Sequence, residues 1–176
     1  TAALAAMGIC TKINMVPMYV AMGFSQGVMP FISYNYSSGD HKRMRGALSF
    51  SIKIVEVMLV LSAAAMFFFA GPLVRAFIGD QETVAYGARF LRGFCLAQPF
   101  LALDFLCVGV FQAVGMGREA LVLAILRKAV FEIPLLYLLN RFFPLYGLPY
   151  AQAVTECVMA AIAVGLVVRF LRGLKK

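Results

Sequence analysis

Residues 50–69 read FSIKIVEVMLVLSAAAMFFF. This run matches the roughly 20 apolar residues that a helix needs to cross the hydrocarbon core of a bilayer. Its only charged residues are Lys53 and Glu56, which stand about one helical turn apart near its start. A stretch of this length with so few charges predicts a transmembrane helix, and it makes lipid the solvent for this part of the chain.

Four more apolar stretches flank this run, and together they predict an all-α membrane protein with five transmembrane helices. The first stretch is the longest and contains Gly23, Gly27 and Pro30, so we expect a bend or a break there. Residues 73–92 mix polar and apolar side chains, and we place them at the membrane interface. The predicted helices cover about residues 2–35, 50–69, 93–114, 120–139 and 147–168.

The composition excludes several classes of protein. The 176 residues are 62% hydrophobic and 14% charged, too few polar residues to cover the surface of a soluble domain. The four cysteines lie in apolar stretches without a Cys-x-x-Cys pair, and His41 is the single histidine, so neither a disulfide framework nor a zinc site is expected. No HExxH, GxSxG or Walker motif occurs. The sequence therefore predicts neither an enzyme nor a bound cofactor.

The net charge of +8 indicates a topology rather than a nucleic-acid partner, because the basic residues gather at helix ends. Cytoplasmic loops carry the excess of Lys and Arg in membrane proteins. This predicts a cytoplasmic C-terminus, and a first helix that runs inward without a preceding signal, as in a fragment that lacks earlier helices. The more basic side holds Lys42, Arg43, Arg45, Arg118, Arg169, Arg172, Lys175 and Lys176; the other holds Arg75, Arg89, Arg92 and Arg141.

Three carboxylates fall near the centres of three successive predicted spans. They are Asp104, Glu132 and Glu156. An ionisable group inside a bilayer costs about 2.5 to 3.5 kcal/mol on insertion scales, so each of them needs a compensating interaction or a function. We therefore treat Glu132 and Glu156, together with Arg127 and Lys128, as a candidate intramembrane charge network.

Each acid also has a purely structural interpretation. Glu132 follows Lys128 by one turn, with Arg127 beside that lysine, so a local ion pair explains Glu132 as well as a transport role does. Glu156 follows Gln152 by one turn and can be protonated and hydrogen-bonded. Asp104 has no cation three or four residues away, so its partner comes from another helix, from water or from a bound ion.

Residues 23–40, GFSQGVMPFISYNYSSGD, resemble a motif of the multidrug and toxic compound extrusion (MATE) family. That family has a GxxQGxxPxxxYNYGA run followed by a basic loop, and here Ser37 and Ser38 replace the Gly-Ala pair. The resemblance implies structural roles for the matching residues Gln26, Gly27, Pro30, Tyr34 and Asn35.

Weaker matches follow in the family's order over essentially the whole chain. Gln112 lies in a run that resembles FQAxG, and Arg127 with Pro134 resembles R…IPL. The start of the last span resembles GLxGxxxAxPxxD, although Glu156 stands where the family usually has Asp and Val154 where it often has Pro-Ile. The resemblance implies the eighth to twelfth helices of a twelve-helix transporter built from two bundles.

The resemblance also implies a function. Such proteins export cationic and amphipathic compounds in exchange for Na⁺ or H⁺, and the partners implied are the lipid bilayer, small organic cations and the remaining helices of the same protein. In Na⁺-coupled members an acidic residue on the tenth helix helps to bind the ion, and Asp104 matches that position. Asp104 is thus the expected cation-binding residue, and a Na⁺ ligand if the coupling ion is Na⁺.

Two other functions remain open from the sequence. A flippase for lipid-linked sugars or peptidoglycan precursors, from the same superfamily, would need several deep arginines for a pyrophosphate, and only Arg127 and Lys128 lie deep. A non-transporting membrane subunit would make the buried acids structural.

Overall fold

A computed structural model describes residues 2–142 and 147–174, and within these ranges the chain is helical with short turns and no strand. The fold class is the predicted one. The helices are α1 (Ala2–Ser37), α2 (His41–Phe68), α3 (Ala70–Arg75), α4 (Gln81–Cys95), α5 (Gln98–Ala113), α6 (Gly117–Ile125), the π-helical segment η1 (Leu126–Glu132), α7 (Ile133–Phe142) and α8 (Gly147–Gly173).

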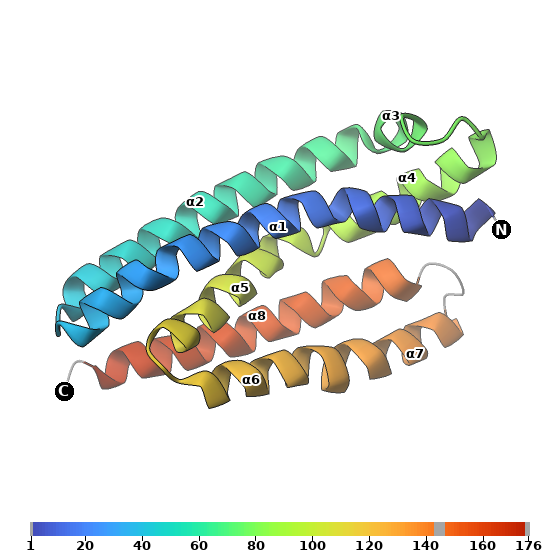
Figure 1. Ribbon diagram of the computed structural model, residues 1–176. Coiled ribbons are helices and arrows are strands. Elements are labelled where there is room, and N and C mark those ends of the chain that lie inside the picture. The colour runs from blue at the N-terminus through green and yellow to red at the C-terminus, as the bar shows by residue number, and fades with distance from the viewer. Residues whose placement is uncertain (1, 143–146, 175–176) are drawn as a thin grey trace.

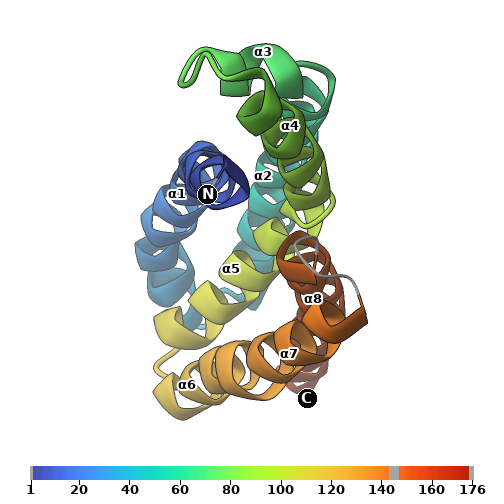
Figure 2. The same cartoon turned by 90° about the vertical axis from the view of Figure 1, so that its right-hand side faces the viewer.

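The long helices form a bundle with α5 at its centre. α1 and α2 run side by side, α8 lies beside the run from α6 to α7, and α4 followed by α5 crosses between the two pairs (Figure 1). Seen end-on, α5 lies between α1 and α8 (Figure 2). Residues on α5 can therefore contact four other helices.

The first helix is not interrupted at the expected place. α1 remains helical through Pro30, and also through Pro17. A proline removes one backbone hydrogen bond, but a membrane helix can tolerate this where neighbouring groups satisfy the freed carbonyl. The glycines and the proline of the motif thus lie within a single helix, without the break that was one of the two expected possibilities.

The second helix begins earlier than residue 50. Asp40 caps α2, because its Oδ1 accepts a hydrogen bond from the Arg43 backbone N–H at 3.0 Å. Gly39 allows the preceding turn with a φ of +77°, in a region that favours glycine. Only residues 38–40 form the polar loop, and the basic residues that follow belong to the first turn of α2.

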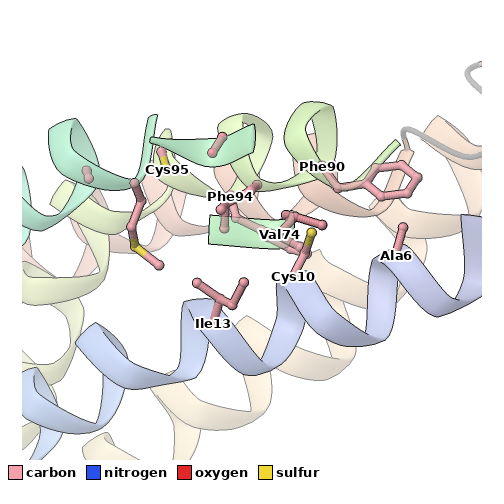
Figure 3. Packing of buried hydrophobic residues seen from close by; sticks show 11 residues of the cluster. Ala6, Cys10, Ile13, Val74, Phe90, Phe94 and Cys95 are labelled. Atoms are coloured by element: carbon pink, nitrogen blue, oxygen red, sulfur yellow. The ribbon is translucent and has the colours of Figure 1, made fainter. Parts of the chain in front are cut away.

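The segment expected at the membrane interface is part of the helical bundle. Residues 81–92 belong to α4, whose Phe90 and Leu91 are buried. Figure 3 shows side chains of α1, among them Cys10 and Ile13, pointing toward this cluster. Amphipathic periodicity alone does not distinguish a helix at the lipid surface from one that packs on a protein neighbour, and this helix does the latter.

The predicted third helix is divided between the end of α4 and the whole of α5. α4 and α5 meet at a 46° bend, and together they are long and apolar enough to cross a membrane. Pro99 lies in the first turn of α5, where it has no N–H to continue the hydrogen bonds of α4. By length and apolarity alone, α1, α2 and α8 also qualify as spans within the described residues.

The predicted end of this helix at Gly115 is confirmed. The Met116 N–H donates to the Phe111 carbonyl and the Gly115 N–H to the Gln112 carbonyl, which is the Schellman pattern of a helix C-terminus. Gly115 has the left-handed φ of +79° that this motif needs. The turn directs the chain back so that α6, η1 and α7 run beside α8.

The predicted fourth helix forms a continuous helical run that changes type in its middle. The Ile133 N–H bonds to the Lys128 carbonyl, five residues earlier, which defines the π-helical geometry of η1. Pro134 follows directly, and its ring would clash with the carbonyl four residues earlier in a regular α-helix. The wider π turn accommodates the proline. It also sets the directions of the charged residues that η1 carries.

Candidate functional site

Asp104 on α5 and Arg127 on η1 form a buried ion pair. Arg127 Nη1 donates to Asp104 Oδ2 at 2.8 Å, and the two side chains are 19% and 3% exposed. The partner that Asp104 lacks on its own helix thus comes from the next span, one of the alternatives that the sequence left open.

Glu156 on α8 lies on the other side of the same arginine. Its Oε1 is 3.9 Å from Arg127 Nη1, within ion-pair range but too long for a hydrogen bond. The Glu156 side chain is 5% exposed. Three helices thus bring together Asp104, Arg127 and Glu156, a cluster that we call the charge triad. The charged neighbour of Glu156 on the adjoining helix is thus this guanidinium.

The guanidinium is held in place by more than its charge. Arg127 Cζ lies 5.3 Å from the centre of the Phe105 ring, a cation–π geometry. Phe105 follows Asp104 on α5, so one helix supplies both the carboxylate and the ring. Lys128, the next residue of η1, pairs with Glu132 instead.

With both carboxylates ionised, the charges of the triad do not balance. Two ionised carboxylates and one guanidinium carry a net charge of −1. Asp104 Oδ1 and Glu156 Oε2 are buried, and neither has a hydrogen-bond partner among the described residues. Buried charges are ordinarily paired or bound to a cation. The triad can therefore take up one further positive charge, and the oxygen atoms to receive it are present.

Glu132 pairs with Lys128 as the spacing predicts. Lys128 Nζ lies 2.7 Å from Glu132 Oε1 and 2.6 Å from Oε2. This pair is more exposed than the triad, with side chains 62% and 25% accessible. The charged residues thus form two separate groups. Arg127 lies within ion-pair distance of Asp104 and Glu156, while Lys128 pairs with Glu132.

A cavity of about 270 Å³ adjoins the second pair. Lys128, Glu132 and Gln152 form part of its wall, and so does Asn14 of α1. Asn14 Oδ1 accepts a 3.1 Å hydrogen bond from Gln98 Nε2, and both residues are buried. We did not predict this pair from the sequence. Each residue is an amide side chain within an otherwise apolar stretch, and this feature could have identified both of them.

The residues of the family motif lie mostly on the outside of this chain. Asn35 is the exception, because it is buried and its Nδ2 donates to the Phe31 carbonyl at 2.7 Å. Tyr34 is 72% exposed. The structural roles predicted for the motif stay predictions, and an outward position shows that most of these side chains do not act by packing within this chain. The exposed ones are Gln26, Gly27, Pro30, Tyr34, Gln112 and Pro134.

Neither the cysteines nor the acids form a metal cluster in the described part of the chain. All four cysteines are free; Cys10, Cys95 and Cys107 are buried, and Cys157 is exposed. No group of three or more His, Cys, Asp or Glu side chains in the described ranges could hold a metal ion. The two carboxylates of the triad are the closest approach to a cation site.

The sequence matches known transporters over nearly its whole length. The family model described as MatE matches residues 1–138. The chain is 31% identical to the multidrug export protein MepA of Staphylococcus aureus over 170 residues, and also 31% identical to MepA of Staphylococcus saprophyticus. Each match covers 97% of this chain and 37% of the relative. The chain therefore spans little more than a third of the length of these relatives.

Solved structures show the same fold. An outward-facing multidrug resistance MATE family transporter superposes with a TM-score of 0.93 at 18% identity, over 99% of this chain and 40% of that structure. The Vibrio cholerae MATE transporter VcmN in its bent form gives 0.90 at 22% identity, with coverage of 99% and 40%. The family match, the membrane-length helices and the shared fold agree: the chain belongs to the MatE family, whose members are membrane transporters and not enzymes.

Proposed function

We propose that this chain forms part of a secondary active transporter that exports cationic or amphipathic compounds in exchange for Na⁺ or H⁺. One observation carries the proposal. The charge triad places two buried carboxylates around a single guanidinium, with Arg127 Nη1 2.8 Å from Asp104 and 3.9 Å from Glu156. A site with one uncompensated negative charge in the middle of a membrane protein is suited to a coupling cation.

The triad suggests how the ion would be coupled to movement. When the coupling ion is absent, Arg127 holds Asp104. A proton on Asp104, or a Na⁺ at its oxygens, would weaken that ion pair and leave Arg127 free to move toward Glu156. Because the residues lie on η1, α5 and α8, such a shift would change the forces between three helices. Coupling requires that the ion binds the two helix arrangements with different affinity.

The proposal also includes the cellular membrane that holds the chain and the orientation of its helices in that membrane. We propose a bacterial or archaeal plasma membrane, with the α1–α2 turn and the end of α8 on the cytoplasmic side. The support is the excess of basic residues there, including Lys42, Arg43 and Arg172. The remaining helices of the transporter, the bilayer and small organic cations are the proposed partners.

The flippase alternative loses support from the triad. A pyrophosphate site needs arginines whose charge is available to a ligand. Arg127 is occupied by two carboxylates and Lys128 by Glu132. The deep basic residues of this chain are thus compensated within it.

The test is transport by the whole protein that carries this chain, reconstituted in vesicles with a fluorescent organic cation. An imposed Na⁺ or H⁺ gradient should drive uphill movement of the dye, and dye movement should in turn drive the ion. Ion gradients that have no effect on dye movement, with intact folded protein, would refute antiport. Separate Na⁺ and H⁺ gradients identify the coupling ion.

A further inference from the structure

A groove of about 380 Å³ runs between α2 and α8, over Cys107 of α5. Its walls are mostly aliphatic, and its basic residues both come from α2. The side chains that matter here are Leu48, Ile52 and Val168 on the walls, and Arg45 and Lys53 along one edge. The groove belongs neither to the charge triad nor to the cavity beside Lys128.

The two cations stand on the same face of α2. Arg45, Ser49 and Lys53 are spaced four residues apart, so they line one side of the helix, and the two charges are separated by about 12 Å at a rise of 1.5 Å per residue. The Arg45 guanidinium is fixed at the groove by an Nη2–H that donates to the Leu171 carbonyl of α8. This contact ties the beginning of α2 to the end of α8.

Neither cation is neutralised by another residue that the structure describes. No carboxylate lies within ion-pair distance of Arg45 or Lys53 in the described part of the chain. Glu56, one turn after Lys53, does not pair with it. A third cation, Arg172, stands one turn beyond Val168 on α8 and is exposed.

The groove is lined by the first half of α2 and the last part of α8. The α1–α2 turn and the end of α8 come together at one end of the bundle (Figure 1). On the orientation proposed above, this end meets the cytoplasmic leaflet. α2 has 28 residues and is therefore about 42 Å long, longer than the hydrocarbon core of about 30 Å. Arg45 in the second turn then reaches the headgroup region, and Lys53 can extend its ammonium toward it from below.

We infer that this groove binds an anionic phospholipid of the membrane leaflet it faces. The phosphate lies between Arg45 and Lys53, and an acyl chain lies along Leu48, Ile52 and Val168. The charge and the apolar wall support the same occupant. A basic edge alone would suit any anion, and an aliphatic groove alone would suit any lipid tail, but their combination between two membrane helices suits a lipid with a negative headgroup.

The first test is native mass spectrometry of the whole protein that carries this chain, with phosphatidylglycerol and phosphatidylcholine added in equal amounts. The wild-type protein should retain phosphatidylglycerol preferentially. Lys53→Gln should weaken its retention about fivefold, since a basic residue near the lipid surface contributes about 1 kcal/mol. Lys42→Gln is the matched control, because Lys42 is exposed at the same end but lies outside the groove.

A second variant distinguishes the contribution of the apolar groove to lipid binding from that of the surface charge. Val168→Trp fills the groove and keeps every cation, and it should also reduce phosphatidylglycerol retention. Excess glycerol phosphate should not displace the lipid. The inference is wrong if Lys42→Gln acts as strongly as Lys53→Gln, if Val168→Trp has no effect, or if glycerol phosphate competes.

The groove must also be open to lipid in the whole protein. A nitroxide attached to Ser49→Cys should show high accessibility to molecular oxygen in bilayers of phosphatidylcholine. Low accessibility would mean that another helix or a second copy covers the groove, and would overturn the inference. All three measurements report binding or contact, so they are independent of whether the protein transports dye.

Discussion

Arg127 Nη1 lies 2.8 Å from Asp104 Oδ2, although the two residues are 23 positions apart and belong to separate helices. The same nitrogen is 3.9 Å from Glu156 Oε1. Each carboxylate is thus within reach of one shared positive charge. The arrangement explains how two acids can be tolerated at similar depth in a membrane bundle, and with both acids ionised it leaves one negative charge uncompensated.

Replacing Asp104 should abolish coupling and preserve the protein. Asp104→Asn keeps the size of the side chain, and Arg127 remains paired with Glu156, so insertion should be normal. Coupled efflux should fall about tenfold or more, within the roughly 5- to 150-fold range that typical coupling energies span. Dye efflux and membrane protein content measured on the same vesicles check this.

Asp104→Glu is the matched control, because it retains a carboxylate but moves its oxygens. It should keep partial activity. An Asp104→Asn variant that still exports the dye at the normal rate, with unchanged ion dependence, would show that Asp104 serves only packing or solvation.

Removing the arginine should harm stability more than removing Asp104. Arg127→Gln leaves two buried carboxylates without a counter-charge, and breaking a buried pair costs about 3 to 5 kcal/mol. The double variant Asp104→Asn with Arg127→Gln removes one acid as well, and should recover most of the loss. Thermal unfolding of the purified whole protein measures both. Equal destabilisation by the single and double variants would refute the shared role of Arg127.

Glu132 should be mainly structural. Glu132→Gln leaves Lys128 without its partner, so the folded yield should fall severalfold while the coupling ratio in the protein that does fold stays normal. The double variant Glu132→Gln with Lys128→Gln removes both charges and should restore the yield. Detergent-extracted monodisperse protein and dye–ion stoichiometry are the readouts. Normal yield with lost coupling would assign Glu132 to the transport site instead.

Asp80 should stabilise the start of α4 in a pH-dependent way. The Thr83 hydroxyl and the Thr83 backbone N–H donate to its carboxylate at 2.6 and 2.9 Å, and this lowers the pKa of Asp80 below its ordinary value of 3.8. A lowered pKa means that the folded state binds the proton less tightly than the unfolded chain. The cap therefore stabilises the protein fully above 3.8, and this contribution is lost as the pH falls through the lowered pKa.

The measurement compares unfolding temperatures across pH. Asp80→Ala should unfold at a lower temperature than the wild type at neutral pH, and the difference should shrink in acid. Asp80→Asn keeps a capping oxygen and should lose less, without the acid-dependent change that a carboxylate produces. A wild-type advantage over Asp80→Ala that stays constant well below 3.8 would contradict this account.

The sequence by itself determined that lipid surrounds much of the chain and that the fold is all-α. It also identified the acidic residues that need a counter-charge inside the membrane. Apolar runs of bilayer length, such as residues 50–69, are local features, and so is the four-residue spacing that pairs Lys128 with Glu132. Gly115 marked the end of its helix because a left-handed residue is required there. Such properties depend on neighbours along the chain, so they can be read without knowing how helices pack.

Only the tertiary structure decided which face of each helix meets which neighbour. It packed one face of α4 against α1, a contact that the amphipathic pattern does not specify, since an amphipathic face can bury itself on either lipid or protein. It also turned Arg127 toward Asp104 while Lys128 turned away to Glu132. The π turn before Pro134 and the crossing of α5 between α1 and α8 set these directions. Contacts between distant segments depend on helix rotation and packing, which no local pattern in the chain specifies.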